Sequence, residues 1–193
     1  MLMQNINVNK FFFDKMIEQQ KIFLSPVSSD ALFNNYKNSV VNGFSSDVFS
    51  KFSSSEKYQS DLINNETIRL WGIREAKITP FNKVSKGDLI LFYHKGFIVG
   101  KSTIIFKDKN QKLSENIWGV AFKSFSGITE YWENIVFLNN FEKVNIDYQM
   151  LIKYAGFSEK ASVRGFNQYP KIGVDNILLN FKTLNNFIKS HLV

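Results

Sequence analysis

Two apolar runs at the centre of the chain predict a pair of strands. Residues 89–93 form a continuous apolar run directly after Gly87-Asp88, and an apolar run that follows a turn signal is typical of a buried strand. Residues 97–106 are rich in β-branched and aromatic residues on both sides of Gly100. We therefore expect a hairpin that turns at residues 94–96, where Gly96 supplies turn geometry.

The regions on either side of these strands show the spacing of amphipathic helices. One helix is predicted to end before Pro26, and a second is predicted to begin with Asp30 as its cap and to be closed by Gly43. Residues 113–117 predict a short helix, and residues 175–192 predict a C-terminal helix. The apolar positions behind these predictions are Phe12, Met16, Ile17 and Phe23; Leu32, Phe33, Tyr36 and Val40; a short turn with Val48, Phe49 and Phe52; and Ile177, Leu178, Phe181, Leu184, Phe187, Ile188 and Leu192.

Composition excludes several classes of site. The 193-residue chain has no cysteine and two histidines, so it has no disulfide, thiolate metal site, cysteine nucleophile or histidine-rich metal centre. The first residues lack the basic region of a signal peptide, and no apolar run approaches the roughly 20 residues of a membrane span. We therefore expect a soluble, cytoplasmic protein with one sizeable core.

The net charge of +7 is concentrated in the middle of the chain. Residues 1–60 carry a net +1, residues 61–120 a net +4 and residues 121–193 a net +2. This excess over the predicted strands favours a polyanionic partner. The alternative is that a lysine-rich, solvated surface serves solubility alone.

Motifs between residues 66 and 172 follow one another in a recognisable order. They are Trp71-Gly72-Ile73, Lys83-Val84-Ser85-Lys86-Gly87-Asp88, Tyr93, Val99-Gly100, a strand-like segment over residues 131–138 with an exit at 144–146, a short helix over 147–154 and a loop over 162–169. This order resembles the EVE branch of the PUA-like superfamily, which is related to the YTH readers of methylated adenine. Within that superfamily, the chain is most similar to the N-terminal DNA-recognition domains of McrB-type modification-dependent restriction systems.

The resemblance implies an α+β fold. Its expected form is a PUA-like, or EVE, partly closed β-barrel with flanking helices and a helical N-terminal extension. Residues 53–60 are polar and aperiodic, which is typical of a linker. We therefore predict a helical N-terminal extension with its linker over residues 1–60, and a barrel domain with a C-terminal helix over residues 61–193.

The resemblance also implies a nucleic-acid-binding module that flips a modified, methylated base of DNA into an aromatic pocket. A flipped base needs aromatic faces beside it, because stacking contributes about 1–3 kcal/mol per base. The implied pocket residues are Trp71, Gly72, Tyr93 and Trp118. The alternatives are that Trp71 is a core residue, that Trp118 caps the core and that Tyr93 is an ordinary barrel aromatic. Trp132 is assigned to the core.

Four cations are expected to contact phosphate, and one loop is expected to enter a groove. The cations are Arg74, Lys95, Lys101 and Arg164, and the loop residues are Phe166, Asn167 and Gln168. Each cation could instead be a solvated surface charge. No catalytic residue, metal ion or cofactor is expected. The partners implied by the resemblance are an AAA+ GTPase motor domain and a nuclease subunit, which these 193 residues do not contain. We therefore expect that the chain is an excised domain or acts with a partner chain.

Two other functions remain open. One is a PUA-like module that binds structured or modified RNA. The other is a metal-dependent nuclease, because Asp61 with Glu75-Ala-Lys77 has the spacing of two Mg²⁺ carboxylates and a lysine that steadies the attacking water; Pro80 would break the strand that this site needs. Residues 96–102 resemble a phosphate-binding loop, but only three residues separate the glycines where the motif has four.

Overall fold

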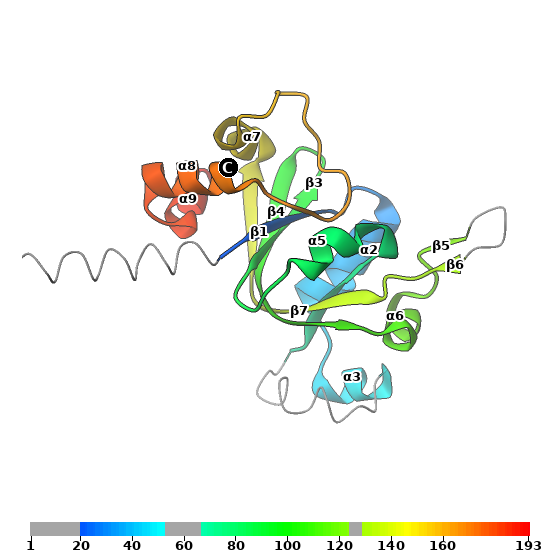
Figure 1. Cartoon of the computed structure of the whole chain (residues 1–193). Coiled ribbons are helices and arrows are strands. Elements are labelled where there is room, and N and C mark those ends of the chain that lie inside the picture. Colours follow the sequence, from blue (N-terminus) through cyan, green and yellow to red (C-terminus); the bar gives the residue numbers. More distant parts are fainter. Residues whose placement is uncertain (1–19, 53–66, 124–128) are drawn as a thin grey trace, which may run out of the picture.

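A curled six-stranded sheet forms the centre of the computed structural model, which describes residues 20–52, 67–123 and 129–193 (Figure 1). β1 runs parallel to β3, whereas the other neighbouring pairs in this sheet are antiparallel. The expected α+β class and partly closed barrel are confirmed. Across the sheet the strands are β2 (Arg69–Ile73), β7 (Asn134–Asp147), β4 (Phe97–Lys109), β3 (Leu89–His94), β1 (Ile22–Pro26) and β8 (Asn167–Gln168), and a separate pair joins β5 (Phe122–Lys123) to β6 (Thr129–Glu130).

The predicted hairpin is confirmed, and its apolar run reflects burial on both faces of the sheet. Ile90 and Phe92 enter one hydrophobic cluster and Leu91 enters another, because successive side chains of a strand point to opposite faces. A strand covered on both faces reads as a continuous apolar run. The two turn residues, Lys95 and Gly96, have φ angles of 45° and 92°, as a tight hairpin turn requires.

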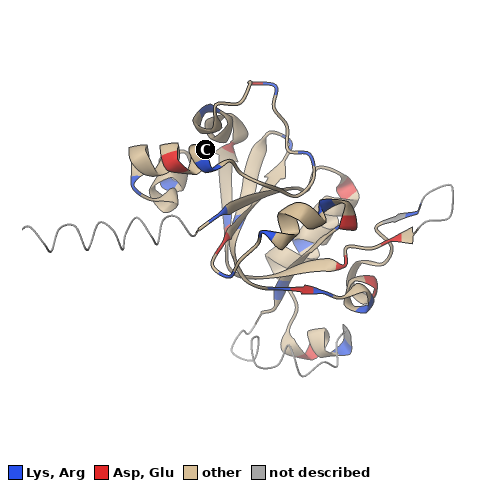
Figure 2. Ribbon diagram, viewed as in Figure 1, with Lys and Arg blue, Asp and Glu red and all other residues tan. Residues whose placement is uncertain are grey.

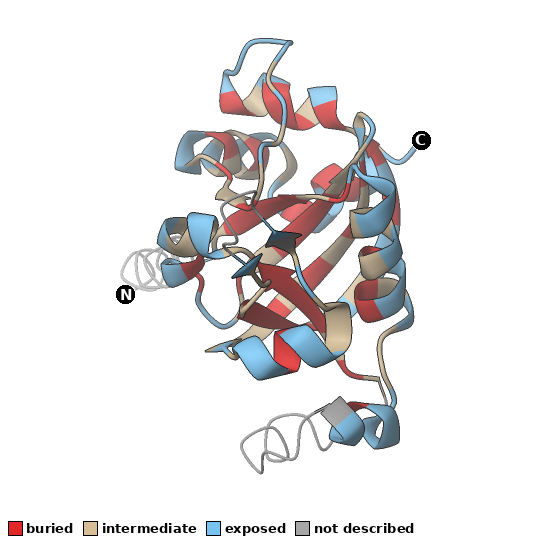
Figure 3. Ribbon diagram, turned by 90° about the vertical axis from the view of Figure 1, so that its right-hand side faces the viewer, coloured by how far each residue is buried: buried red, intermediate tan, exposed pale blue. Residues whose placement is uncertain are grey.

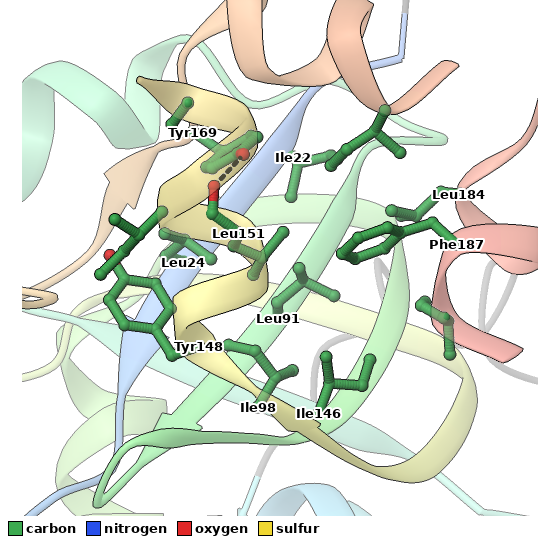
Figure 4. Close-up of a cluster of buried hydrophobic side chains, with 14 of the residues drawn as sticks. Ile22, Leu24, Leu91, Ile98, Ile146, Tyr148, Leu151, Tyr169, Leu184 and Phe187 are labelled. Carbon is green, nitrogen blue, oxygen red and sulfur yellow. Dashed lines mark hydrogen bonds between the residues drawn. The ribbon is translucent and has the colours of Figure 1, made fainter. Parts of the chain in front are cut away.

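Helices cover both faces of the sheet (Figure 3). On one face, Leu151 of α7 (Tyr148–Ala155), Ile177 of α8 (Lys171–Phe181) and Phe187 of α9 (Leu184–Ser190) belong to a single buried cluster. Figure 4 shows part of this cluster, including Leu151 and Phe187. Tyr36 and Phe81 belong to the cluster on the other face. The helical segments are α2 (Asp30–Tyr36), the π-helix η1 (Lys37–Asn42), α3 (Ser46–Phe52), the 3-10 helix η3 (Glu75–Lys77), α5 (Ile78–Asn82), α6 (Gln111–Trp118), α7 (Tyr148–Ala155), α8 (Lys171–Phe181) and α9 (Leu184–Ser190).

The prediction that a helix continues to Pro26 is wrong, because Ile22–Pro26 is strand β1. This strand lies between β3 and β8, and Phe23 is fully buried and stacks on Phe166 with ring centroids 5.0 Å apart. An apolar segment buried on both faces cannot be told from a helix by periodicity alone. The earlier part of that predicted helix, the linker and the predicted boundary near residue 60 lie outside the described residues and stay predictions.

Three other predictions change in detail. The second helix is present, but Ser29 caps it by accepting a hydrogen bond from the Leu32 amide at 3.2 Å. The single C-terminal helix is instead two helices, because Lys182 has a φ of 65° and Thr183 caps the start of α9. The strand predicted over residues 131–138 begins only at Asn134, which leaves Trp132 ahead of β7.

We expect Tyr169→Phe to lower the free energy of unfolding by about 1 kcal/mol, because it removes a buried hydrogen bond. The Tyr169 hydroxyl donates to the Leu151 carbonyl at 2.6 Å (Figure 4), and burial raises the pKa of Tyr169 above its ordinary value. Urea unfolding measures the change. Tyr154→Phe is the control, because within the described ranges the Tyr154 hydroxyl has no hydrogen-bond partner. Equal losses in the two variants would contradict this role for the Tyr169 hydroxyl.

Candidate aromatic pocket

A pocket of about 250 Å³ lies where β1 and β2 approach each other. In the sheet order these strands are separated by β7, β4 and β3, so they meet only because the sheet curls on itself. The indole Nε1 of Trp71 in β2 donates a 2.8 Å hydrogen bond to the Ser25 hydroxyl in β1 and bridges this seam. The lining residues are Ser25, Pro26, Leu32, Trp71, Gly72, Ile73, Arg74, Lys77, Trp132, Gly165 and Phe166.

Trp71 is at once a core residue and a wall of this pocket. Its side chain is 4% exposed and meets Phe92 edge-on, with ring centroids 5.6 Å apart. Its only hydrogen-bonding group is already bound to Ser25. Trp71 can therefore offer a ligand an aromatic face but no donor.

Gly72 allows two further tryptophans, Trp118 and Trp132, to approach the backbone of β2 closely. A side chain at this position would collide with the Cβ of Trp132 and would approach the Cζ3 of Trp118 to 2.7 Å. Trp118 and Trp132 meet edge-to-face, with centroids 6.4 Å apart. Close approach of this kind is a reason for glycine within a strand.

Trp132 and Trp118, the two tryptophans next to Gly72, differ in their position relative to the pocket. Trp132 is half-buried and lines the pocket, so its assignment to the core is wrong. Trp118, at the end of α6, lies in a narrow adjoining space that is also lined by Trp71 and Trp132. Its indole Nε1 is buried and has no hydrogen-bond partner among the described residues. Trp118 thus supports the pocket from behind, and sequence spacing alone did not reveal the contribution of Trp132.

Tyr93 is not brought to this pocket. Its side chain packs against the cluster on the face of the sheet opposite to that of Phe92 and Trp71. There it packs on Tyr148, with ring centroids 4.9 Å apart. Tyr93 and Trp71, which were both predicted as walls of one pocket, therefore lie on opposite faces of the sheet.

Basic and acidic residues are interspersed over the molecule (Figure 2), so the environment of each predicted cation decides its role. Arg74 lines the pocket, but its Nε donates to Glu130 at 2.8 Å. Lys101 pairs with Glu142 at 2.8 Å and donates to Asn185 at 2.6 Å in a separate cavity beside α9. Lys95 is exposed at the hairpin tip and Arg164 is exposed beside Gly165. Of the four, Arg74 and Arg164 are close to the pocket residues.

The loop predicted to enter a groove is partly anchored. Phe166 is 3% exposed and stacks on Phe23, so it is a buried wall of the pocket and not a free wedge. Asn167 donates to the carbonyls of Arg164 and Gly165, which fixes the turn before β8. Gln168 pairs with Phe23 in the sheet.

Lys77 is a pocket residue that the prediction of phosphate contacts missed. Its side chain passes against Gly165, and its Nζ lies 3.4 Å from the Asn167 carboxamide oxygen. Within the described ranges it has no carboxylate partner. The sequence feature that could have indicated Lys77 as a pocket residue is its position three residues after Arg74, at the first turn after the strand that contains Trp71-Gly72.

Glu75 and Lys77, two of the residues with nuclease-like spacing, do not form a metal site in the described parts of the chain. Glu75 accepts hydrogen bonds from Asn134 at 2.9 Å and Lys109 at 3.1 Å, which hold the pKa of its carboxyl below the ordinary value. Lys77 turns instead towards Asn167, and Asp61 lies outside the described residues. Nowhere in the described ranges do three or more metal-binding side chains gather. No described helix has the length and apolar content of a membrane-crossing segment.

Comparisons with known proteins identify the fold. No family model matches the sequence, and no curated protein matches it. The N-terminal domain of Thermococcus gammatolerans McrB, solved bound to m5C DNA, matches with a TM-score of 0.62 and 12% identity over 84% of this chain and 98% of that one. The Pho92 YTH domain in complex with m6A (TM-score 0.44, 13% identity, 86% and 85% covered) and a ZmASCH mutant from Zymomonas mobilis (0.39, 8%, 84% and 97%) match at lower scores. The McrB match, together with the curled six-stranded sheet, shows that the chain has a PUA-like fold.

Proposed function

We propose that this protein recognises a modified, methylated base in DNA by holding the flipped base in the pocket between β1 and β2. The observation that carries the proposal is the pocket itself, which Trp71, Gly72 and Trp132 line together. Aromatic faces in a site that excludes water bind an unstacked base, and a methyl group adds to the fit only in a close apolar slot. The same fold carries m5C DNA in the McrB domain.

The chemistry of the lining favours binding over catalysis. Among the described residues that line the pocket there is no carboxylate and no imidazole, which are the groups that general acid–base catalysis uses most often. We therefore propose a specificity module without catalysis of its own. Its place would be in a modification-dependent restriction system, with an AAA+ GTPase motor and a nuclease subunit on other domains or chains.

A competition experiment tests the proposal. A labelled methylated duplex is displaced from the protein by unlabelled methylated duplex or by the matched unmodified duplex at one salt concentration, because affinities at different salt cannot be compared. We expect the methylated competitor to act at a concentration at least tenfold lower. Equal competition would contradict base recognition. Stronger displacement by the same sequence as RNA would favour the RNA-binding alternative, because the 2′-hydroxyl is what distinguishes the two.

We expect Lys77→Gln to weaken binding to modified and unmodified duplexes alike. Lys77 lines the pocket, and its ammonium group has no carboxylate partner among the described residues, so loss of one phosphate contact should reduce the slope of log K against log[salt] by about 0.9. Titrations at several salt concentrations measure the slope. Lys101→Gln is the comparison, because Lys101 is paired with Glu142 in a different cavity. If the slope changes in Lys101→Gln and not in Lys77→Gln, the phosphate contact lies at the cavity beside α9 and not at the aromatic pocket, which would contradict the role proposed for Lys77.

A further inference from the structure

Ser25 is a buried polar group on the wall of the aromatic pocket. It lies in β1, is 3% exposed and lines the pocket beside Trp71. Side chains two residues apart in a strand point to the same face. Phe23 belongs to the same cluster as Trp71, whereas Leu24 belongs to the cluster on the other face. Ser25 therefore faces the same side as Phe23 and Trp71. The hydroxyl therefore points to the seam where the pocket lies.

The Ser25 hydroxyl has an unused donor. A serine hydroxyl provides one O–H donor and two acceptor lone pairs. One lone pair accepts from the Trp71 indole at 2.8 Å, and within the described ranges the hydroxyl hydrogen has no acceptor. A hydroxyl that accepts a hydrogen bond is polarised into a stronger donor. A ligand with an acceptor at this point would therefore satisfy a group that folding leaves unpaired.

Three other donors near the pocket are already engaged or lie on another side of it. The Trp71 N–H is bound to Ser25, and the Arg74 guanidinium is bound to Glu130. Lys77 lies on the Gly165 side of the pocket, next to Asn167. Ser25 is thus a neutral, buried donor beside the aromatic face on which a base would stack.

We propose that Ser25 determines which bases the pocket accepts, by donating a hydrogen bond to the ring nitrogen at the centre of the Watson–Crick edge. This inference rests on the proposed function. A flipped base enters with this edge leading, because its sugar stays attached to the strand outside. Adenine N1 and cytosine N3 are acceptors, whereas guanine N1 and thymine N3 carry hydrogens. The pocket therefore accepts methylated adenine or cytosine and disfavours guanine and thymine.

The test replaces that ring nitrogen by a C–H group. The probes are DNA duplexes with N6-methyladenine or its 1-deaza analogue, and with 5-methylcytosine or its 3-deaza analogue, each opposite an abasic site so that no base pair differs between them. For the methylated base that the wild-type protein prefers, we expect the deaza analogue to bind about tenfold more weakly, the effect of leaving one buried donor unpaired. The 7-deaza form of N6-methyladenine, altered at the opposite edge, is the control and should bind like its parent.

Two variants link the effect to Ser25. Ser25→Ala should bind parent and deaza duplexes equally, and Ser25→Thr, which keeps the hydroxyl, should restore the difference. Wild-type protein that prefers a methylated duplex but does not distinguish it from its deaza analogue would overturn the role of Ser25 and leave the reader function intact. Wild-type protein without any preference for a methylated base would overturn the proposed function and this inference with it.

Discussion

Trp132→Ala is expected to lower the affinity for a methylated duplex about tenfold or more, because stacking on one aromatic ring contributes roughly 1–3 kcal/mol per base. Trp132 lines the pocket, yet it is only half-buried and precedes β7. Its removal should therefore affect ligand binding more than folding. Equilibrium titration with the methylated duplex measures the affinity, and urea unfolding of the same variant measures stability.

Trp132→Phe separates stacking from general disturbance of the site. It keeps an aromatic face at the same position and should retain most of the affinity, whereas Trp132→Ala should not. Wild-type affinity in the alanine variant would show that Trp132 does not touch the base. In that case the pocket as described here would not be the binding site.

Trp71→Ala is expected to lower the free energy of unfolding by about 3–5 kcal/mol, the usual effect of removing a large buried aromatic side chain. Trp71 is 4% exposed, meets Phe92 and holds the Ser25 hydroxyl across the seam of the sheet. Its loss would thus open a cavity and separate β1 from β2 at this point. Urea or thermal unfolding measures the effect.

Trp71→Phe is the matched variant, since it keeps an aromatic ring against Phe92 but has no N–H for Ser25. It should be clearly more stable than Trp71→Ala. An alanine variant with the unfolding midpoint of the wild type would contradict the burial of Trp71 at the seam. Because Trp71 serves both stability and the pocket, a binding defect in its alanine variant alone cannot identify the site, whereas one in Trp132→Ala can.

Local sequence signals predicted the elements whose partners lie nearby in the chain. The hairpin of β3 and β4 was predictable because its turn residues and both of its strands lie within 21 consecutive residues, Leu89–Lys109. β1 was not, because it pairs in parallel with β3, and Ile22 meets Leu89 across a long stretch of sequence. Parallel pairing leaves no turn signal between the strands.

The pocket was predictable only in part, for a similar reason. The Trp71-Gly72 step is a local motif, but Ser25 and Trp132 reach it only when the sheet curls and brings β1 towards β2. Tyr93 was misplaced because a shift of one residue along a strand moves a side chain to the other face. Likewise, the pairing of Lys101 with Glu142 depends on the register of β4 against β7, which composition does not reveal.

The most direct test of base recognition is equilibrium binding of the wild-type protein to duplexes of one sequence that differ at a single base. The duplexes carry adenine, N6-methyladenine, cytosine or 5-methylcytosine at that position, and all are titrated at the same salt concentration. The proposed pocket between Trp71 and Trp132 predicts at least tenfold tighter binding of one methylated duplex than of its unmodified counterpart. Equal affinity for methylated and unmodified duplexes would contradict it.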